Sequence, residues 1–188
     1  MKSISIFAAA TLLSASPLFA DQNNAALKSE AKSIIQSFAG NLKGELQAAM
    51  KAGGPPNAIQ VCNTRAPVIT GASSDESGWS VGRTSLKLRN ADNKPDAWEL
   101  GVLKAFEERK AAGEDPMKIA YAEVVEENGG KTFRFMKAIP TGDVCLACHG
   151  ASIKPEIAAK LDSLYPQDMA RGFSVGDLRG AFTLSKGL

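Results

Sequence analysis

Residues 117–138, MKIAYAEVVEENGGKTFRFMKA, hold the strongest β signal in this sequence of 188 residues. Two runs rich in β-forming residues, Met117 to Glu126 and Lys131 to Ala138, flank the triplet Asn128-Gly129-Gly130. Asn-Gly between such runs is typical of a tight hairpin, because both turn residues need positive φ angles. The stretch therefore predicts two antiparallel strands joined by a short turn.

Side chains alternate along a strand, so the second strand should place Phe133 and Phe135 on one face and Arg134 and Met136 on the other. Around the hairpin, apolar periodicity and Gly or Pro signals predict further elements. We expect helices over 25–50, 56–69, 95–112 and 155–164, a loop over 71–78, and strands over 79–83 and 178–185 with Leu178, Phe182 and Leu184 on one side. Pro67 is expected to kink or shorten the second helix. This order predicts an α+β fold with one domain over residues 21–188.

The first 20 residues, MKSISIFAAATLLSASPLFA, have the pattern of a secretory signal peptide. Lys2 precedes an apolar run from Ile4 to Leu13, and the small residue Ala20 marks a cleavage point. The run is shorter than the roughly 20 apolar residues of a membrane helix, so we expect export to the periplasm without membrane insertion. Without Lys2 the chain carries 21 basic and 20 acidic side chains, a balance that argues against nucleic acid as a partner.

Residues 145–149, CLACH, form the C-x-x-C-H motif of c-type haem attachment. Two thiols at this spacing, Cys145 and Cys148, can add to the two vinyl groups of one porphyrin, which places His149 beneath the iron. The alternative is a Cys145–Cys148 disulfide of the thioredoxin type. That alternative gives no reason for the position of His149, which is the only histidine in the chain. The motif therefore predicts one covalently attached haem c with His149 as an axial ligand.

The second axial ligand cannot be a histidine, because the chain has no other. Haem attachment would leave Cys62 as an unpaired thiol in an oxidising compartment, which makes it a candidate thiolate ligand. A methionine is the other candidate, and Met136 is the best placed because its strand leads into the motif. An inert buried thiol and ordinary core packing are the alternatives for these two residues. The choice between Cys62 and Met136 stays open on these grounds.

Basic side chains on either side of the motif are candidates to pair with the haem propionates, since guanidinium groups match carboxylates in geometry. They are Arg83, Lys87, Arg89 and Arg179. The alternative for each is a solvated surface charge. Gly176 and Gly180 in addition suggest a close backbone approach in the last strand.

Four blocks of sequence resemble the single-haem, PAS-like c-type haem domain family, which was formerly a domain of unknown function. They are VCNTRAP (61–67), VGRTSLKLRNADNKPDAWE (81–99), CLACHG (145–150) and GFSVGDLRGAFTLS (172–185). The resemblance implies a PAS-like antiparallel sheet with a helical N-terminal extension. It also implies a haem ligated by the motif histidine and a distal cysteine, which are His149 and Cys62 in this chain.

The function implied is that of a periplasmic monohaem protein that senses redox state or a diatomic gas. The alternative is a low-potential electron-transfer cytochrome with a redox partner protein. An enzyme is not expected, because a peroxidase-like site needs an open iron position and a distal acid–base residue, and no second histidine is present.

Overall fold

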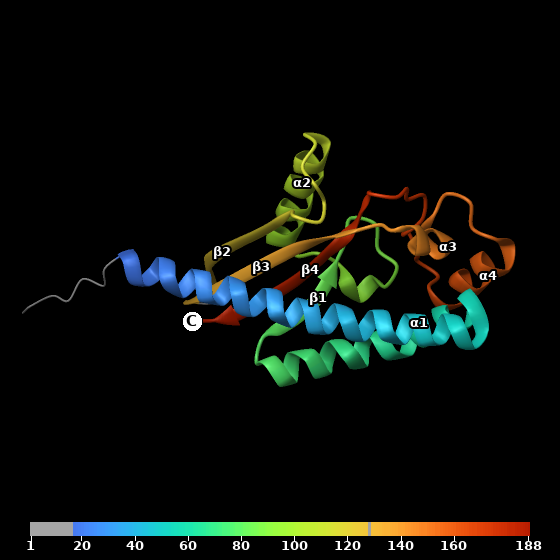
Figure 1. Ribbon diagram of the computed structural model, residues 1–188, viewed down its shortest axis with the longest axis horizontal. Helices are drawn as coiled ribbons and strands as arrows, with labels where there is room; N and C mark the ends of the chain where they lie inside the picture. The colour runs from blue at the N-terminus through green and yellow to red at the C-terminus, as the bar shows by residue number, and fades with distance from the viewer. Residues whose placement is uncertain (1–16, 128) are drawn as a thin grey trace, which may run out of the picture.

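Four antiparallel strands form an open sheet in the order β1-β4-β3-β2, as the computed structural model shows (Figure 1). The structure describes residues 17–127 and 129–188. The predicted hairpin is confirmed, since β2 and β3 pair in antiparallel register and Gly129 has a φ of 78°. Asn128 of the predicted turn lies outside the described residues. The strands are β1 (Ser80–Thr84), β2 (Ala120–Glu127), β3 (Gly130–Pro140) and β4 (Leu178–Gly187).

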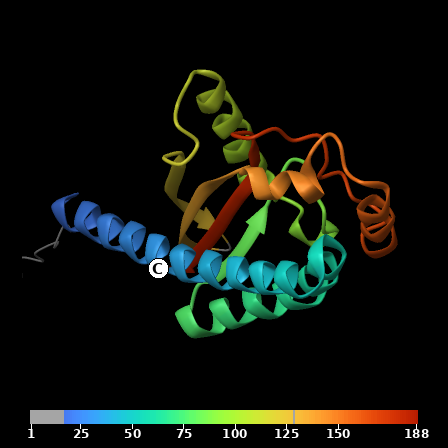
Figure 2. The same cartoon turned by 45° about the vertical axis from the view of Figure 1, so that its right-hand side comes forward.

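The helix α1 (Pro17–Ser77) consists of two arms that meet at Gly53 and Gly54, where the backbone leaves the helical conformation. The two arms lie side by side and run in opposite directions along one face of the sheet (Figures 1 and 2). Apolar side chains of the first arm pack against the face that carries Phe133 and Phe135; they are Leu27, Ala31, Ile35 and Phe38. The predicted end of the first helix at the Gly-Gly pair is confirmed. The predicted signal peptide falls mainly on residues 1–16, outside the described part of the chain.

The loop predicted over 71–78 is wrong, because the second arm of α1 remains helical to Ser77. The hydroxyls of Thr70, Ser74 and Ser77 donate to backbone carbonyls four residues earlier, at 2.6–3.1 Å, so these polar groups are satisfied within the helix. Pro67 lies within the arm and does not end it. Gly78, with a φ of 69°, follows the last helical residue.

The opposite face of the sheet is covered by α2 (Ala97–Ala111) (Figure 2). Asp96 caps this helix by accepting from the backbone N–H of Glu99 at 2.7 Å, and the Glu99 carboxylate accepts from the backbone N–H of Asp96 at 3.0 Å. The buried side chains Val102, Leu103 and Phe106 pack on Met136 and its neighbours. A short 3₁₀ turn, η1 (Ala91–Asn93), precedes α2.

The two faces of β3 are as predicted, with Phe133 and Phe135 toward α1 and Met136 toward α2. The prediction for β4 is wrong in part. Leu184 packs on the α1 face, but Leu178 joins the core beneath α2. The reason is a register shift where Pro140 pairs with Leu178, which breaks the simple alternation near the start of β4.

Three short elements follow β3 at one end of the sheet: η2 (Asp143–Cys145), α3 (Leu146–His149) and α4 (Pro155–Leu164). The predicted bounds of α4 are confirmed. The α4 helix lies beside the bend of α1 (Figure 1), where Ile157 and Leu161 pack on Ile59 of the second arm. The α+β fold class with a helical N-terminal part is thus confirmed. Within the described residues, no helix has the length and apolar character needed to span a membrane.

Candidate cofactor site

The C-x-x-C-H segment folds into η2 and α3 directly after β3. One turn of helix brings the thiols of Cys145 and Cys148 to the same side of the chain. Gly150 ends α3, and its N–H donates to the carbonyl of Leu146 at 2.9 Å. A Cβ at Gly150 would lie 2.6 Å from that same carbonyl oxygen, so only glycine fits this close approach. The chain therefore holds both thiols and His149 on one short, sharply ended helix.

The ring of His149 has a fixed orientation. Its Nδ1 lies 2.8 Å from the carbonyl oxygen of Ala170, which can only accept, so Nδ1 carries the proton. Burial lowers the pKa of His149 to about 3, assisted by the charges of Arg179 and Arg89, and the ring is neutral at neutral pH. Nε2 therefore offers a lone pair, toward which Nε of Arg179 points at 3.4 Å. A neutral imidazole with Nδ1 bonded to a carbonyl is the form that ligates metals.

Cys62, far away in the sequence, lies at the same end of the molecule. It belongs to the second arm of α1, one turn beyond Ile59, and Cys148 packs against the cluster that contains Ile59. Burial raises the pKa of the Cys148 thiol, and Cys62 is close enough to add to that rise. Burial raises the pKa of Cys62 itself, while the charges of Arg83 and Arg89 oppose that rise. The structure thus brings Cys62 together with the motif.

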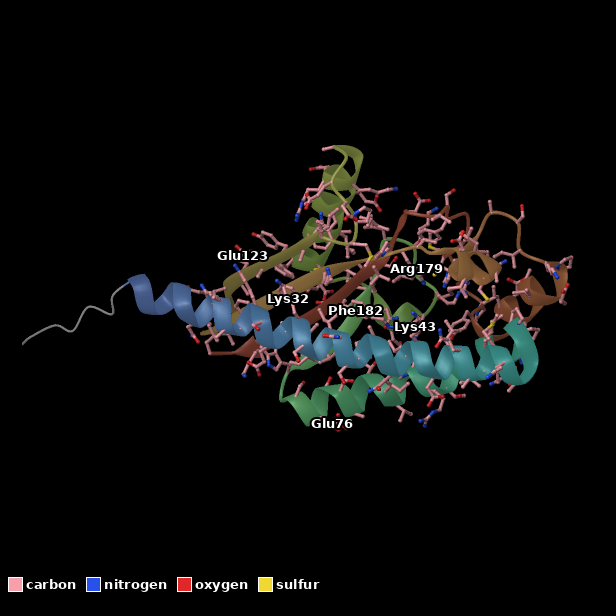
Figure 3. The ribbon with its side chains drawn as sticks, viewed as in Figure 1. Lys32, Lys43, Glu76, Glu123, Arg179 and Phe182 are labelled. Atoms are coloured by element: carbon pink, nitrogen blue, oxygen red, sulfur yellow. The ribbon has the colours of Figure 1, made fainter. Side chains whose placement is uncertain are left out.

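Three predicted arginines also gather here. Burial lowers the pKa of Arg83, and burial together with Arg89 and Arg83 lowers the pKa of Arg179 to about 10. Arg179 lies at the end of β4 nearest α3 (Figure 3) and donates to Ser85 Oγ and to the Lys87 carbonyl, both at 3.2 Å. Within the described part of the chain, no carboxylate pairs with Arg83 or Arg179. The site therefore has an excess of half-buried positive charge.

Unlike Arg83 and Arg179, Arg89 has a carboxylate partner, and Lys87 is exposed to solvent. Arg89 forms an ion pair with Asp168, with Nε–Oδ1 at 3.2 Å, and also donates to the backbone carbonyls of Cys148 and Ala170. Lys87 is exposed, with its ammonium 5.1 Å from the ring centre of Phe173. The predicted contacts of both side chains with haem propionates stay predictions.

Met136 does not lie with these residues. Its side chain is fully buried beneath α2, in a cluster with Val102, Phe106 and Ile119. This is the ordinary core packing that the sequence left as its alternative role.

Sequence reasoning missed Tyr165, Asp168 and Ala170, which line the site from the loop after α4. Burial raises the pKa of Tyr165, and the nearby thiol of Cys62 adds to that rise. Asp168 Oδ1 accepts from the backbone N–H of Ala170 at 2.9 Å, an Asx turn that the sequence could have suggested. Nothing local in the sequence indicates that this turn contacts His149.

Comparison with known proteins gives one family match and one structural match. The family model described as Tll0287-like matches residues 14–186. The crystal structure of the cyanobacterial heme-protein Tll0287 has a similar fold, with a TM-score of 0.59 and 23% sequence identity over 92% of this chain and 97% of that chain. A search of curated proteins finds no match.

Proposed function

Because the chain belongs to the Tll0287-like family, in which Tll0287 is described as a heme-protein, we propose that it binds one haem c. Cys145 and Cys148 form the two thioether bonds and His149 is an axial ligand. The observation that carries the proposal is the convergence of the lone histidine, in its metal-ligating tautomer, with both motif thiols and Cys62.

We assign Cys62 as the second axial ligand. It approaches from α1, a different element from the one that holds His149, so the two side chains can address opposite faces of one porphyrin. Burial raises the pKa of Cys62, and the charges of Arg83 and Arg89 oppose that rise and would help to hold a thiolate bound to iron. To reach the same position, Met136 would have to break its packing with α2. Its departure would create a cavity in the core, at a cost of roughly 2–5 kcal/mol.

The half-buried arginines fit the acidic edge of a haem. The guanidinium groups of Arg83 and Arg179 are half-buried and have no carboxylate partner among the described residues, so their partial loss of hydration is costly. Two propionates would neutralise them with charge-assisted hydrogen bonds. For Arg179 this would also end its donation to Nε2 of His149, which frees the lone pair for iron.

The physiological role we propose is that of a redox or diatomic-gas sensor in the periplasm, after removal of a signal peptide near Ala20, and not that of an enzyme. Bound haem supplies one-electron chemistry and a place for gases to coordinate. The support for sensing is the position of Cys62, because a change in its ligation acts directly on the second arm of α1. That arm is held at the site through Ile59, Ile157 and Leu161.

A low-potential electron carrier is the second candidate. Two apolar side chains next to the site are exposed, Val144 by 62% and Met169 by 64%. They flank Cys145 and Ala170, and exposed apolar groups beside a redox centre suit the docking of a partner protein.

Haem attachment is tested on protein produced in a host with the haem-attachment machinery and purified under denaturing conditions. We expect a mass increase of one haem, which persists after acid–acetone extraction, and a pyridine haemochrome spectrum of the c type. A double variant, Cys145→Ala with Cys148→Ala, should lose the added mass. A wild-type protein that carries no covalent haem would contradict the proposal.

The two roles are separated by exposing the reduced protein to CO. A sensor should bind CO rapidly and completely, since its distal ligand must yield. Absence of any spectral change over hours would favour the electron carrier, which needs a firmly six-coordinate iron.

A further inference from the structure

An ion pair with little solvent access lies directly behind the axial histidine. The side chain of Asp168 is 1% exposed and that of Arg89 is 13% exposed. Arg89 donates to both carboxylate oxygens of Asp168, at 3.2 and 3.3 Å. Such a pair has given up most of its hydration, so its geometry is held by the groups around it and not by solvent.

The same guanidinium reaches two backbone carbonyls of the site. Its Nη2 donates to the carbonyl oxygen of Cys148 at 2.5 Å and to that of Ala170 at 3.2 Å. The Ala170 oxygen is also the acceptor for Nδ1–H of His149. Asp168 in turn accepts from the N–H of Ala170, so the ion pair binds Ala170 at both its N–H and its carbonyl. Arg89 thus connects the motif helix to the carbonyl that orients His149.

We propose that Arg89 and Asp168 are positioning residues for His149, acting through the shared carbonyl of Ala170. This inference rests on the proposed haem ligation by His149. Arg89 then has two effects. It fixes the position of the Ala170 carbonyl, and its guanidinium competes with Nδ1–H of His149 for the electron density of that oxygen.

The competition has a definite direction. An oxygen that already accepts from a guanidinium is a weaker acceptor for Nδ1–H, so the imidazole keeps less negative charge and donates less to iron. Removing Arg89 should strengthen the Nδ1–H···O bond, increase electron donation and stabilise ferric iron. The midpoint potential should therefore fall.

Arg171 offers a matched control. Its Nε donates to Asp168 Oδ2 at 2.9 Å, and it carries the same charge as Arg89. Within residues 17–127 and 129–188, its other side-chain hydrogen bond is with Asp162, and none reaches Cys148 or Ala170. A role that consisted only of neutralising Asp168 would be shared by both arginines.

The experiment compares Arg89→Gln, Arg89→Lys and Arg171→Gln in the haem-loaded protein, by ferric low-spin EPR and by redox titration. Both Arg89 variants should change the spread of g values, which responds to the orientation and donor strength of the axial imidazole. Arg89→Gln should lower the potential, and Arg89→Lys should lower it less because the charge remains. Arg171→Gln should leave the g values unchanged.

Unchanged g values in both Arg89 variants, or an equal change in Arg171→Gln, would overturn the inference while leaving the proposed function intact. If Arg89→Gln lacks a native circular dichroism spectrum, Arg89→Lys decides the question alone. A wild-type protein without haem would overturn the proposed function and this inference together, and that outcome is visible before any variant is made.

Discussion

Replacing Cys62 with alanine should convert the ferric haem from thiolate to non-thiolate ligation and raise its midpoint potential strongly. A thiolate stabilises ferric iron, so its loss favours the ferrous state. Axial ligands span roughly 0.8 V of haem potential, and we expect a rise on the order of hundreds of millivolts. The covalent haem should remain, because Cys145 and Cys148 are unchanged. Optical spectra, EPR and redox titration of wild type and Cys62→Ala measure these effects.

The control is Met136→Leu, a change that nearly preserves volume in the core beneath α2. It should leave the ferric spectrum and the potential as in wild type. The opposite pattern, a normal spectrum in Cys62→Ala and an altered one in Met136→Leu, would show that methionine is the ligand and that Cys62 is an inert thiol.

Gly180→Ala should destabilise the whole domain. Gly180 has a φ of 154°, and a Cβ there would lie 2.3 Å from the carbonyl oxygen of Thr84 and 3.0 Å from Cβ of Ser85. The first contact is with the backbone of β1, the neighbouring strand, which cannot move without disturbing the sheet. We expect a loss of about 2–4 kcal/mol in unfolding free energy. The melting temperature should fall by roughly 5–15 °C.

Gly187→Ala serves as the control, since it lies on the same strand and a Cβ there meets nothing within 4 Å. Its stability should stay within about 0.5 kcal/mol of wild type. Equal melting temperatures for Gly180→Ala and wild type would mean that β1 and β4 can separate without cost, contrary to the packing described above.

Local sequence signals predicted the elements that local chemistry determines. The hairpin of β2 and β3, the Gly-Gly break after residue 52 and the bounds of α4 needed no tertiary information. The prediction failed over residues 71–77, where polar and glycine residues usually form loops. There the hydroxyl of Ser74 accepts from the N–H of Val81 at 3.1 Å, so contact with β1 stabilises a helix that propensity disfavours.

For the candidate site too, local sequence provided predictions, and contacts between distant residues could not be predicted. The motif spacing predicted Cys145, Cys148 and His149 as haem-binding residues, and this stays a prediction; the structure adds that Cys62 lies at the same end of the molecule as Cys148. The partners of Arg89 could not be predicted, because its contact with Asp168 joins residues 79 positions apart. A guanidinium suited to a propionate is equally suited to an aspartate, and only the fold decides which one it meets.

The convergence of Cys62 on the motif also has a consequence for unfolding. Almost half of the chain lies between Cys62 and His149, so the proposed bond from each to one iron would close a very large loop. A cross-link of this length removes roughly 4–5 kcal/mol of conformational entropy from the unfolded chain in the simplest polymer treatment. With Cys62 as the proposed ligand, the sulfur–iron bond would be stronger in the ferric state, and we expect the oxidised protein to resist denaturant better than the reduced one. The redox state of the iron would then control how strongly the first and last thirds of the chain are cross-linked.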